Sequence, residues 1–80
     1  MLISVRFFAS YADSLGMART EVAVDPGARV SDLMSLIERL PGAGALPPNP
    51  LVAVNHSYAG PQTPLRAGDE VAVIPPVAGG

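Results

Sequence analysis

Only one stretch of this 80-residue chain has the apolar spacing of a long helix. Between residues 30 and 40, apolar side chains recur every three or four positions, which places them on one helix face: Val30, Leu33, Met34, Ile37 and Leu40. Ser31 or Asp32 suits the start of this helix, and Pro41-Gly42 suits its end. Because a lone helix cannot bury its apolar face by itself, the remaining residues must supply a second layer.

The segments around this helix alternate between apolar and polar residues, as half-buried strands do. Residues 1–8 place Ile3, Val5 and Phe7 on one face, and residues 19–24 alternate in the same way. Further strands are expected at residues 51–54, 58–59 and 71–74, with a short helical turn at residues 9–16 and irregular connections at residues 41–50 and 60–66. The predicted order is strand, strand, helix, strand, short strand, strand.

This order predicts an α+β fold of the β-grasp (ubiquitin-like) type, in which a mixed sheet packs on one main helix. We expect the β-grasp domain to span residues 1–75. Residues 76–80 are then an extended C-terminal Gly-Gly tail, because Pro75-Pro76 restrict the backbone to extended geometry and direct the chain away from the domain.

Composition excludes several classes of protein. Five arginines and no lysine against seven acidic residues give a net charge of −2, which disfavours a nucleic-acid partner. The absence of cysteine excludes disulfides and thiolate metal sites. The first residues lack the pattern of a signal peptide, and no apolar run approaches the roughly 20 residues that span a bilayer. We therefore expect a cytoplasmic protein with no membrane partner.

The residue types needed for an internal active site are scarce. The one histidine, His56, lies in a predicted turn, where a solvated role is favoured. The serines have no nearby base, so the sequence offers few of the residues needed for a Ser-His-Asp catalytic triad. The sequence has no glycine-rich phosphate loop and no metal-ligand spacing, so we expect no metal and no bound cofactor.

The C-terminus is the strongest candidate for chemistry. The tail consists of Pro76, Val77, Ala78, Gly79 and Gly80, and fully extended it reaches about 17 Å at ~3.3–3.6 Å for each residue. Because the last two residues have no side chains, the tail can enter a narrow channel. The tail would then present the Gly80 carboxylate on a thin stalk, and the alternative is an ordinary frayed terminus.

Three large apolar residues fall out of phase with the predicted core. Phe8 follows Phe7, Ile74 follows Val73, and Tyr58 lies on the short strand. They belong to the sheet face away from the helix, and a cluster of this kind indicates a partner-binding surface. Arg6 and Arg66 could add a polar rim. The alternative is that each is a singly exposed apolar residue, which is common.

The motifs at the two ends of the chain support a resemblance to a known family. They are Phe7-Phe8-Ala9 with Leu15-Gly16, Ala53-Val54-Asn55, Pro64-Leu65, the run Gly68-Asp69-Glu70-Val71-Ala72, Pro75-Pro76-Val77 and the final Gly79-Gly80. With these motifs the chain resembles the MoaD/ThiS family of ubiquitin-like sulfur carriers. Within that family it is most similar to the MoaD branch, the sulfur-carrier subunits of molybdopterin synthase.

This resemblance implies a mechanism. An ATP-using, E1-type adenylating enzyme (MoeB-like) would adenylate Gly80, and a sulfur donor protein would supply the sulfur of a C-terminal thiocarboxylate. A MoaE-like large synthase subunit would then take the tail into its own active site. There the thiocarboxylate would pass sulfur to the pterin precursor of molybdenum cofactor biosynthesis. The chain would thus be the small subunit of a two-subunit sulfurtransferase without an active site of its own, and the face of Phe8, Tyr58 and Ile74 would contact both partners.

Three alternatives stay open at this point. The chain could carry sulfur for another pathway, such as thiamin thiazole, cysteine or tRNA thiolation. It could be a ubiquitin-like modifier that acylates lysines, or a plain β-grasp interaction module. The Phe-Phe-Ala and Pro-Pro-Val motifs favour the molybdopterin branch.

Overall fold

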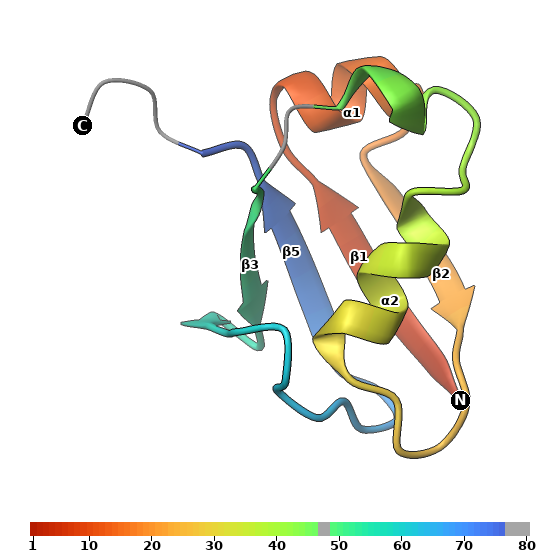
Figure 1. Ribbon diagram of the computed structural model, residues 1–80, viewed down its shortest axis with the longest axis vertical. Coiled ribbons are helices and arrows are strands. Elements are labelled where there is room, and N and C mark those ends of the chain that lie inside the picture. The colour runs from red at the N-terminus through yellow and green to blue at the C-terminus, as the bar shows by residue number, and fades with distance from the viewer. Residues whose placement is uncertain (47–48, 77–80) are drawn as a thin grey trace.

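The computed structural model describes residues 1–46 and 49–76, and it consists of a sheet with a helix packed across one face (Figure 1). The elements in chain order are β1 (Leu2–Phe7), α1 (Ser10–Leu15), β2 (Arg19–Ala23), α2 (Val30–Ile37), the short 3₁₀ helix η1 (Ala43–Ala45), β3 (Leu51–Val54), β4 (Ser57–Tyr58) and β5 (Glu70–Ile74). This order confirms the predicted α+β class and the β-grasp arrangement.

The five strands lie in the order β2-β1-β5-β3-β4. The central strands β1 and β5 are parallel, while the remaining neighbours are antiparallel, so the sheet is mixed. Val5 lies beside Val71, and Phe7 lies beside Val73. Because side chains alternate between faces along a strand, this register places all four on the same face of the sheet.

That face packs against α2 and forms the core. Ile3, Val5 and Phe7 of β1 are buried together with Val71 and Val73 of β5. They meet the apolar face of α2, where Val30, Leu33 and Ile37 are also buried. The predicted core faces of the first strand, the last strand and the main helix are therefore confirmed.

The main helix ends earlier than its apolar spacing suggested. Helix α2 ends at Ile37, after which Arg39 N–H donates to Leu36 O and Leu40 N–H donates to Ile37 O. These are the i→i+3 bonds of a tighter turn, and the following Pro41 disfavours helical geometry at Leu40. At the other end, the carboxylate of Asp32 accepts the Arg29 backbone N–H at 2.8 Å, so Asp32 stabilises the first turn as expected.

The predicted short helical turn is α1, which ends at Gly16 in the left-handed region. Tyr11 and Leu15 of α1 are buried, and burial raises the pKa of the Tyr11 phenol. Among the elements that the structure describes, none of the helices combines the length and the apolar character that crossing a membrane requires.

Gly42 allows the connection at residues 41–46 to lie close against the backbone of α1. Its φ is +89°, and a Cβ built there would collide with the carbonyl oxygen of Ser14. Only glycine satisfies both the backbone angle and the close contact. The connection that follows α2 can therefore pack against the end of α1 only because residue 42 has no side chain.

We predict that Gly42→Ala lowers the free energy of unfolding by at least about 2 kcal/mol, because it combines left-handed backbone strain with a clash against backbone. Gly44→Ala is the matched control, since its φ is not positive and nothing lies within 4 Å of the added carbon. The control should change stability by less than about 1 kcal/mol. Urea denaturation measures both, and equal effects would contradict the packing described for Gly42.

Candidate functional site

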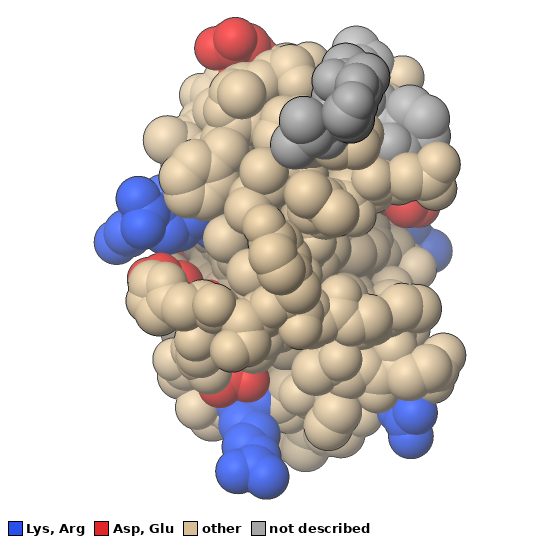
Figure 2. Space-filling model, turned by 90° about the vertical axis from the view of Figure 1, so that its left-hand side faces the viewer, with Lys and Arg blue, Asp and Glu red and all other residues tan. Residues whose placement is uncertain are grey.

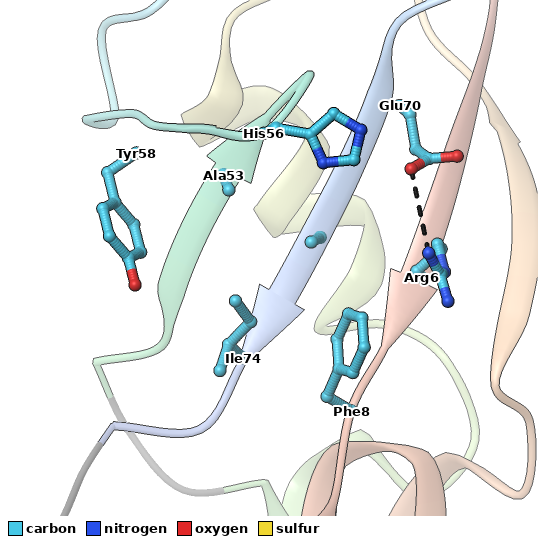
Figure 3. Close-up of a pocket in the computed structure, with 8 residues that line it drawn as sticks. Arg6, Phe8, Ala53, His56, Tyr58, Glu70 and Ile74 are labelled. Atoms are coloured by element: carbon cyan, nitrogen blue, oxygen red, sulfur yellow. Dashed lines mark ion pairs between the residues drawn. The ribbon is translucent and has the colours of Figure 1, made fainter.

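The sheet face opposite α2 contains a hollow of about 290 Å³ (Figure 3). Its lining residues come from β1 and the residue after it, from the β3–β4 hairpin and from β5: Arg6, Phe8, Ala53, His56, Tyr58, Glu70, Ala72 and Ile74. We refer to this surface as the sheet hollow. It brings together the three apolar residues that the sequence placed away from the core, namely Phe8, Tyr58 and Ile74.

Strand alternation places Phe8 and Ile74 in the sheet hollow. Phe8 continues β1, and its N–H donates to Val73 O at 3.2 Å. The preceding Phe7 points into the core and is 3% exposed, whereas Phe8 is 37% exposed. Ile74 follows buried Val73 in the same way. A side chain adjacent in sequence to a core residue of a strand must face the other side.

The β3–β4 hairpin supplies the opposite wall. Asn55 and His56 form its turn, and both have positive φ, 49° and 72°. Two consecutive residues with positive φ are typical of the tight turn that matches the twist of a two-stranded hairpin. In Figure 3 the His56 ring projects over the sheet hollow, and Tyr58 lies at its outer edge, 77% exposed.

A charged pair borders the sheet hollow on the β1 side. Arg6 Nη1 lies 4.0 Å from Glu70 Oε1, and the Arg6 guanidinium carbon lies 5.2 Å from the centre of the Phe8 ring. Because both charged groups are solvent-exposed, the ion pair contributes only about 0–1 kcal/mol to stability. The stacking nevertheless orients Arg6 beside an apolar ring. Arg66, the other arginine considered for a rim, is not among the lining residues.

The side of the molecule that bears β3 and β4 is mostly uncharged. Figure 2 shows this side with the arginine and acidic side chains lying mainly toward its margins. An uncharged centre with charges at the edge is the usual composition of a protein–protein contact surface. The sheet hollow has the same composition, because Phe8, Tyr58 and Ile74 are apolar and the charged pair lies at its border. It therefore has the character of a docking surface.

The described residues do not form a metal centre, since no group of three or more His, Cys, Asp or Glu residues gathers among them. The tail begins at the end of β5, where Pro75 is half-buried and Pro76 is exposed. The other predicted tail residues, Val77, Ala78, Gly79 and Gly80, lie outside the described residues.

Sequence reasoning did not place four lining residues in the sheet hollow: Ala53, His56, Glu70 and Ala72. The alternation around Val71 and Val73 contains a signal for Glu70 and Ala72, because it turns both toward the outer face. Ala53 joins them because the β3–β5 register pairs it with Ala72, and both small side chains line the sheet hollow. The position of His56 in the sheet hollow results from the geometry of the β3–β4 turn.

Comparisons with known proteins give one consistent result. The model of the ThiS family matches residues 5–80. The molybdopterin synthase sulfur carrier subunit of Chlamydomonas reinhardtii is 34% identical over 83 residues, which cover 100% of both chains.

Two solved structures show the same fold at similar identity. The putative molybdopterin converting factor, subunit 1, of Pyrococcus furiosus has a TM-score of 0.85 at 29% identity, covering 96% of this chain and 99% of that one. SAMP1 of Haloferax volcanii has a TM-score of 0.81 at 29% identity, covering 100% of both chains.

We predict that the sheet hollow is dispensable for folding. Tyr58→Ala should change the free energy of unfolding by less than about 1 kcal/mol, because the side chain is 77% exposed. Val73→Ala is the matched comparison on the buried face of the same sheet, 1% exposed, and should cost about 2 kcal/mol or more. Urea denaturation measures the free energy of unfolding of both variants. If Tyr58→Ala lost as much stability as Val73→Ala, Tyr58 would belong to the core.

Proposed function

The chain belongs to the ThiS family, and on that basis we propose that it is the sulfur carrier subunit of a molybdopterin synthase. The observation that carries the proposal is the whole-length match to a molybdopterin synthase sulfur carrier subunit at 34% identity. The Gly79-Gly80 end falls within the residues that the family model matches.

The proposed chemistry begins at the Gly80 carboxylate. A carboxylate is a poor electrophile, so an ATP-using, E1-type (MoeB-like) enzyme first joins it to AMP, with pyrophosphate as the leaving group. Sulfide-level sulfur supplied by a donor protein then attacks the acyl carbon and displaces AMP, which leaves a C-terminal thiocarboxylate. ATP is bound by the activating enzyme and not by this chain. Because activation consumes ATP, we place the carrier in the cytoplasm.

The thiocarboxylate would next enter the active site of a MoaE-like large subunit and pass its sulfur to the pterin precursor of the molybdenum cofactor. The large subunit would provide the acid and base groups. This chain would contribute the tail, whose glycines fit a narrow channel, and the sheet hollow, whose apolar residues Phe8, Tyr58 and Ile74 would contact the large subunit.

The likeness to SAMP1 favours a second candidate function. A related Haloferax volcanii structure is named small archaeal modifier protein 1, and it has a TM-score of 0.83 at 28% identity. A modifier would use the same activated Gly80 but transfer the acyl group to a lysine of a target protein. Carriers for thiamin thiazole, cysteine or tRNA thiolation would likewise differ only in the acceptor.

The proposal predicts that removal of Gly80 abolishes sulfur transfer to the pterin precursor in a reconstitution with the large subunit, because the thiocarboxylate would no longer reach the acceptor. Protein from its native cells should be heavier by the difference between a sulfur and an oxygen atom at the terminus, as measured by mass spectrometry. The control is binding of the shortened chain to the large subunit, which should persist. Full-rate transfer by the shortened chain would contradict the proposal, and lysine-linked conjugates would support the modifier.

The proposed docking surface gives a separate prediction. Phe8→Ala or Ile74→Ala should weaken binding to the large subunit by about tenfold or more, since truncating a central apolar anchor of an interface has effects of that size. Isothermal titration calorimetry measures the affinity, and circular dichroism checks folding. Ser35→Ala is the control, because Ser35 is an exposed residue of α2, which packs on the sheet face opposite the hollow. Unchanged affinity in folded Phe8 and Ile74 variants would exclude the sheet hollow as the contact surface.

A further inference from the structure

One side chain, Asn55, joins the β3–β4 turn to the start of β5. Its Nδ2 donates to Asp69 Oδ1 at 2.9 Å, and its Oδ1 accepts the Glu70 N–H at 3.0 Å. The backbone N–H of Asn55 also donates to Glu70 O at 2.8 Å. Since the Glu70 N–H needs an acceptor and the Asp69 carboxylate needs a donor, only one orientation of the Asn55 amide satisfies both.

Asp69 in turn is fixed to two other segments. Its second carboxylate oxygen, Oδ2, accepts the Arg66 N–H at 2.8 Å, and its carbonyl oxygen accepts the Ser4 N–H of β1 at 3.1 Å. The Asn55–Asp69 link, by which we mean these two side chains and their hydrogen bonds, therefore connects the hairpin turn to a central strand of the sheet.

The hairpin depends on this link because its own pairing is short. Strand β4 has two residues, and among the described strands it pairs only with β3. A short two-stranded hairpin is of marginal stability by itself. Asn55 also has a φ of 49°, a conformation that asparagine tolerates better than most residues. The direction in which His56 and Tyr58 project thus follows from how Asn55 is held.

We propose that Asn55, acting through Asp69, is a positioning residue that holds Tyr58 and His56 at the wall of the sheet hollow for the large synthase subunit. This inference rests on the proposed function for the identity of the partner. The same link places Glu70, whose carboxylate pairs with Arg6 on the opposite side of the hollow. Asn55 therefore determines how the two walls are placed relative to each other, although it does not line the hollow itself.

An exchange of the two side chains tests the proposal. Asn55→Asp places two carboxylates against each other, so we expect the affinity for the large subunit to fall by about tenfold or more. Asn55→Asp combined with Asp69→Asn reverses the polarity of the link. A carboxylate oxygen still accepts the Glu70 N–H, the new amide donates to that carboxylate, and its oxygen accepts the Arg66 N–H. The exchanged protein has the wild-type net charge, and its affinity should return to within about threefold of wild type.

A second measurement separates positioning from general stability. In a Tyr58→Ala background, Asn55→Asp should reduce affinity much less than it does in the wild type, because the side chain that it positions is gone. Titration calorimetry with the purified large subunit measures the affinities of the wild type, of each single variant and of the double variant, at a temperature where each is folded. An equal fold-change in both backgrounds would overturn the proposal, as would a failure of the exchange to restore binding.

The positioning itself can be tested without the partner. In nuclear magnetic resonance spectra of the isolated protein, the ring signals of Tyr58 and His56 should shift in Asn55→Asp and return in the exchanged variant. If Asn55→Asp does not fold, Asp69→Asn alone is the second perturbation, because one amide oxygen must then serve two donors. Unchanged ring signals would overturn the inference. Failure of the wild-type protein to bind the large subunit would instead contradict the proposed function, with the spectra still deciding the positioning.

Discussion

The parallel pairing of β1 with β5 determines both faces of this protein. By placing Val5 beside Val71 and Phe7 beside Val73, it gathers the large apolar side chains under α2. The same register leaves the intervening side chains on the other face, where Arg6 lies beside Ala72 and Ser4 beside Glu70. Since side chains alternate along each strand, a change of register would alter the core and the sheet hollow together.

At the edge of the sheet, hydrogen bonds rather than buried packing determine where the side chains lie. The β3–β4 hairpin carries Tyr58 and His56, but it is attached to the centre through β3 alone and through the polar contacts of its turn. Buried apolar packing therefore sets the position of Phe8 and Ile74, whereas directional hydrogen bonds at the surface set the position of Tyr58. Hydrogen bonds of this kind contribute modestly to stability but restrict orientation strongly.

The sequence predicts local features of this structure well and distant ones poorly. Alternation identifies Ile3, Val5 and Phe7 as core, and it equally identifies Phe8 as outward-facing, because both inferences need only neighbouring residues. It does not show that Ala53 lies beside Ala72, or that Asn55 reaches Asp69 fourteen residues later, because strand register and turn geometry determine those contacts. The early end of α2 at Ile37 reflects a competition between the apolar spacing that continues to Leu40 and the backbone restriction before Pro41.

The position of Ile74 connects the proposed docking surface to the proposed chemistry. Ile74 lines the sheet hollow, and Pro75 and Pro76 follow it directly. A partner that covers the hollow therefore holds the chain at the point from which residues 76–80 start, within about 17 Å of any position that Gly80 can reach. Fixing one end of a short segment raises the effective concentration of the other end in the partner's active site. On this argument the domain would aid the proposed reaction at Gly80 by binding and orientation, while the groups that act on the proposed thiocarboxylate would belong to the partner.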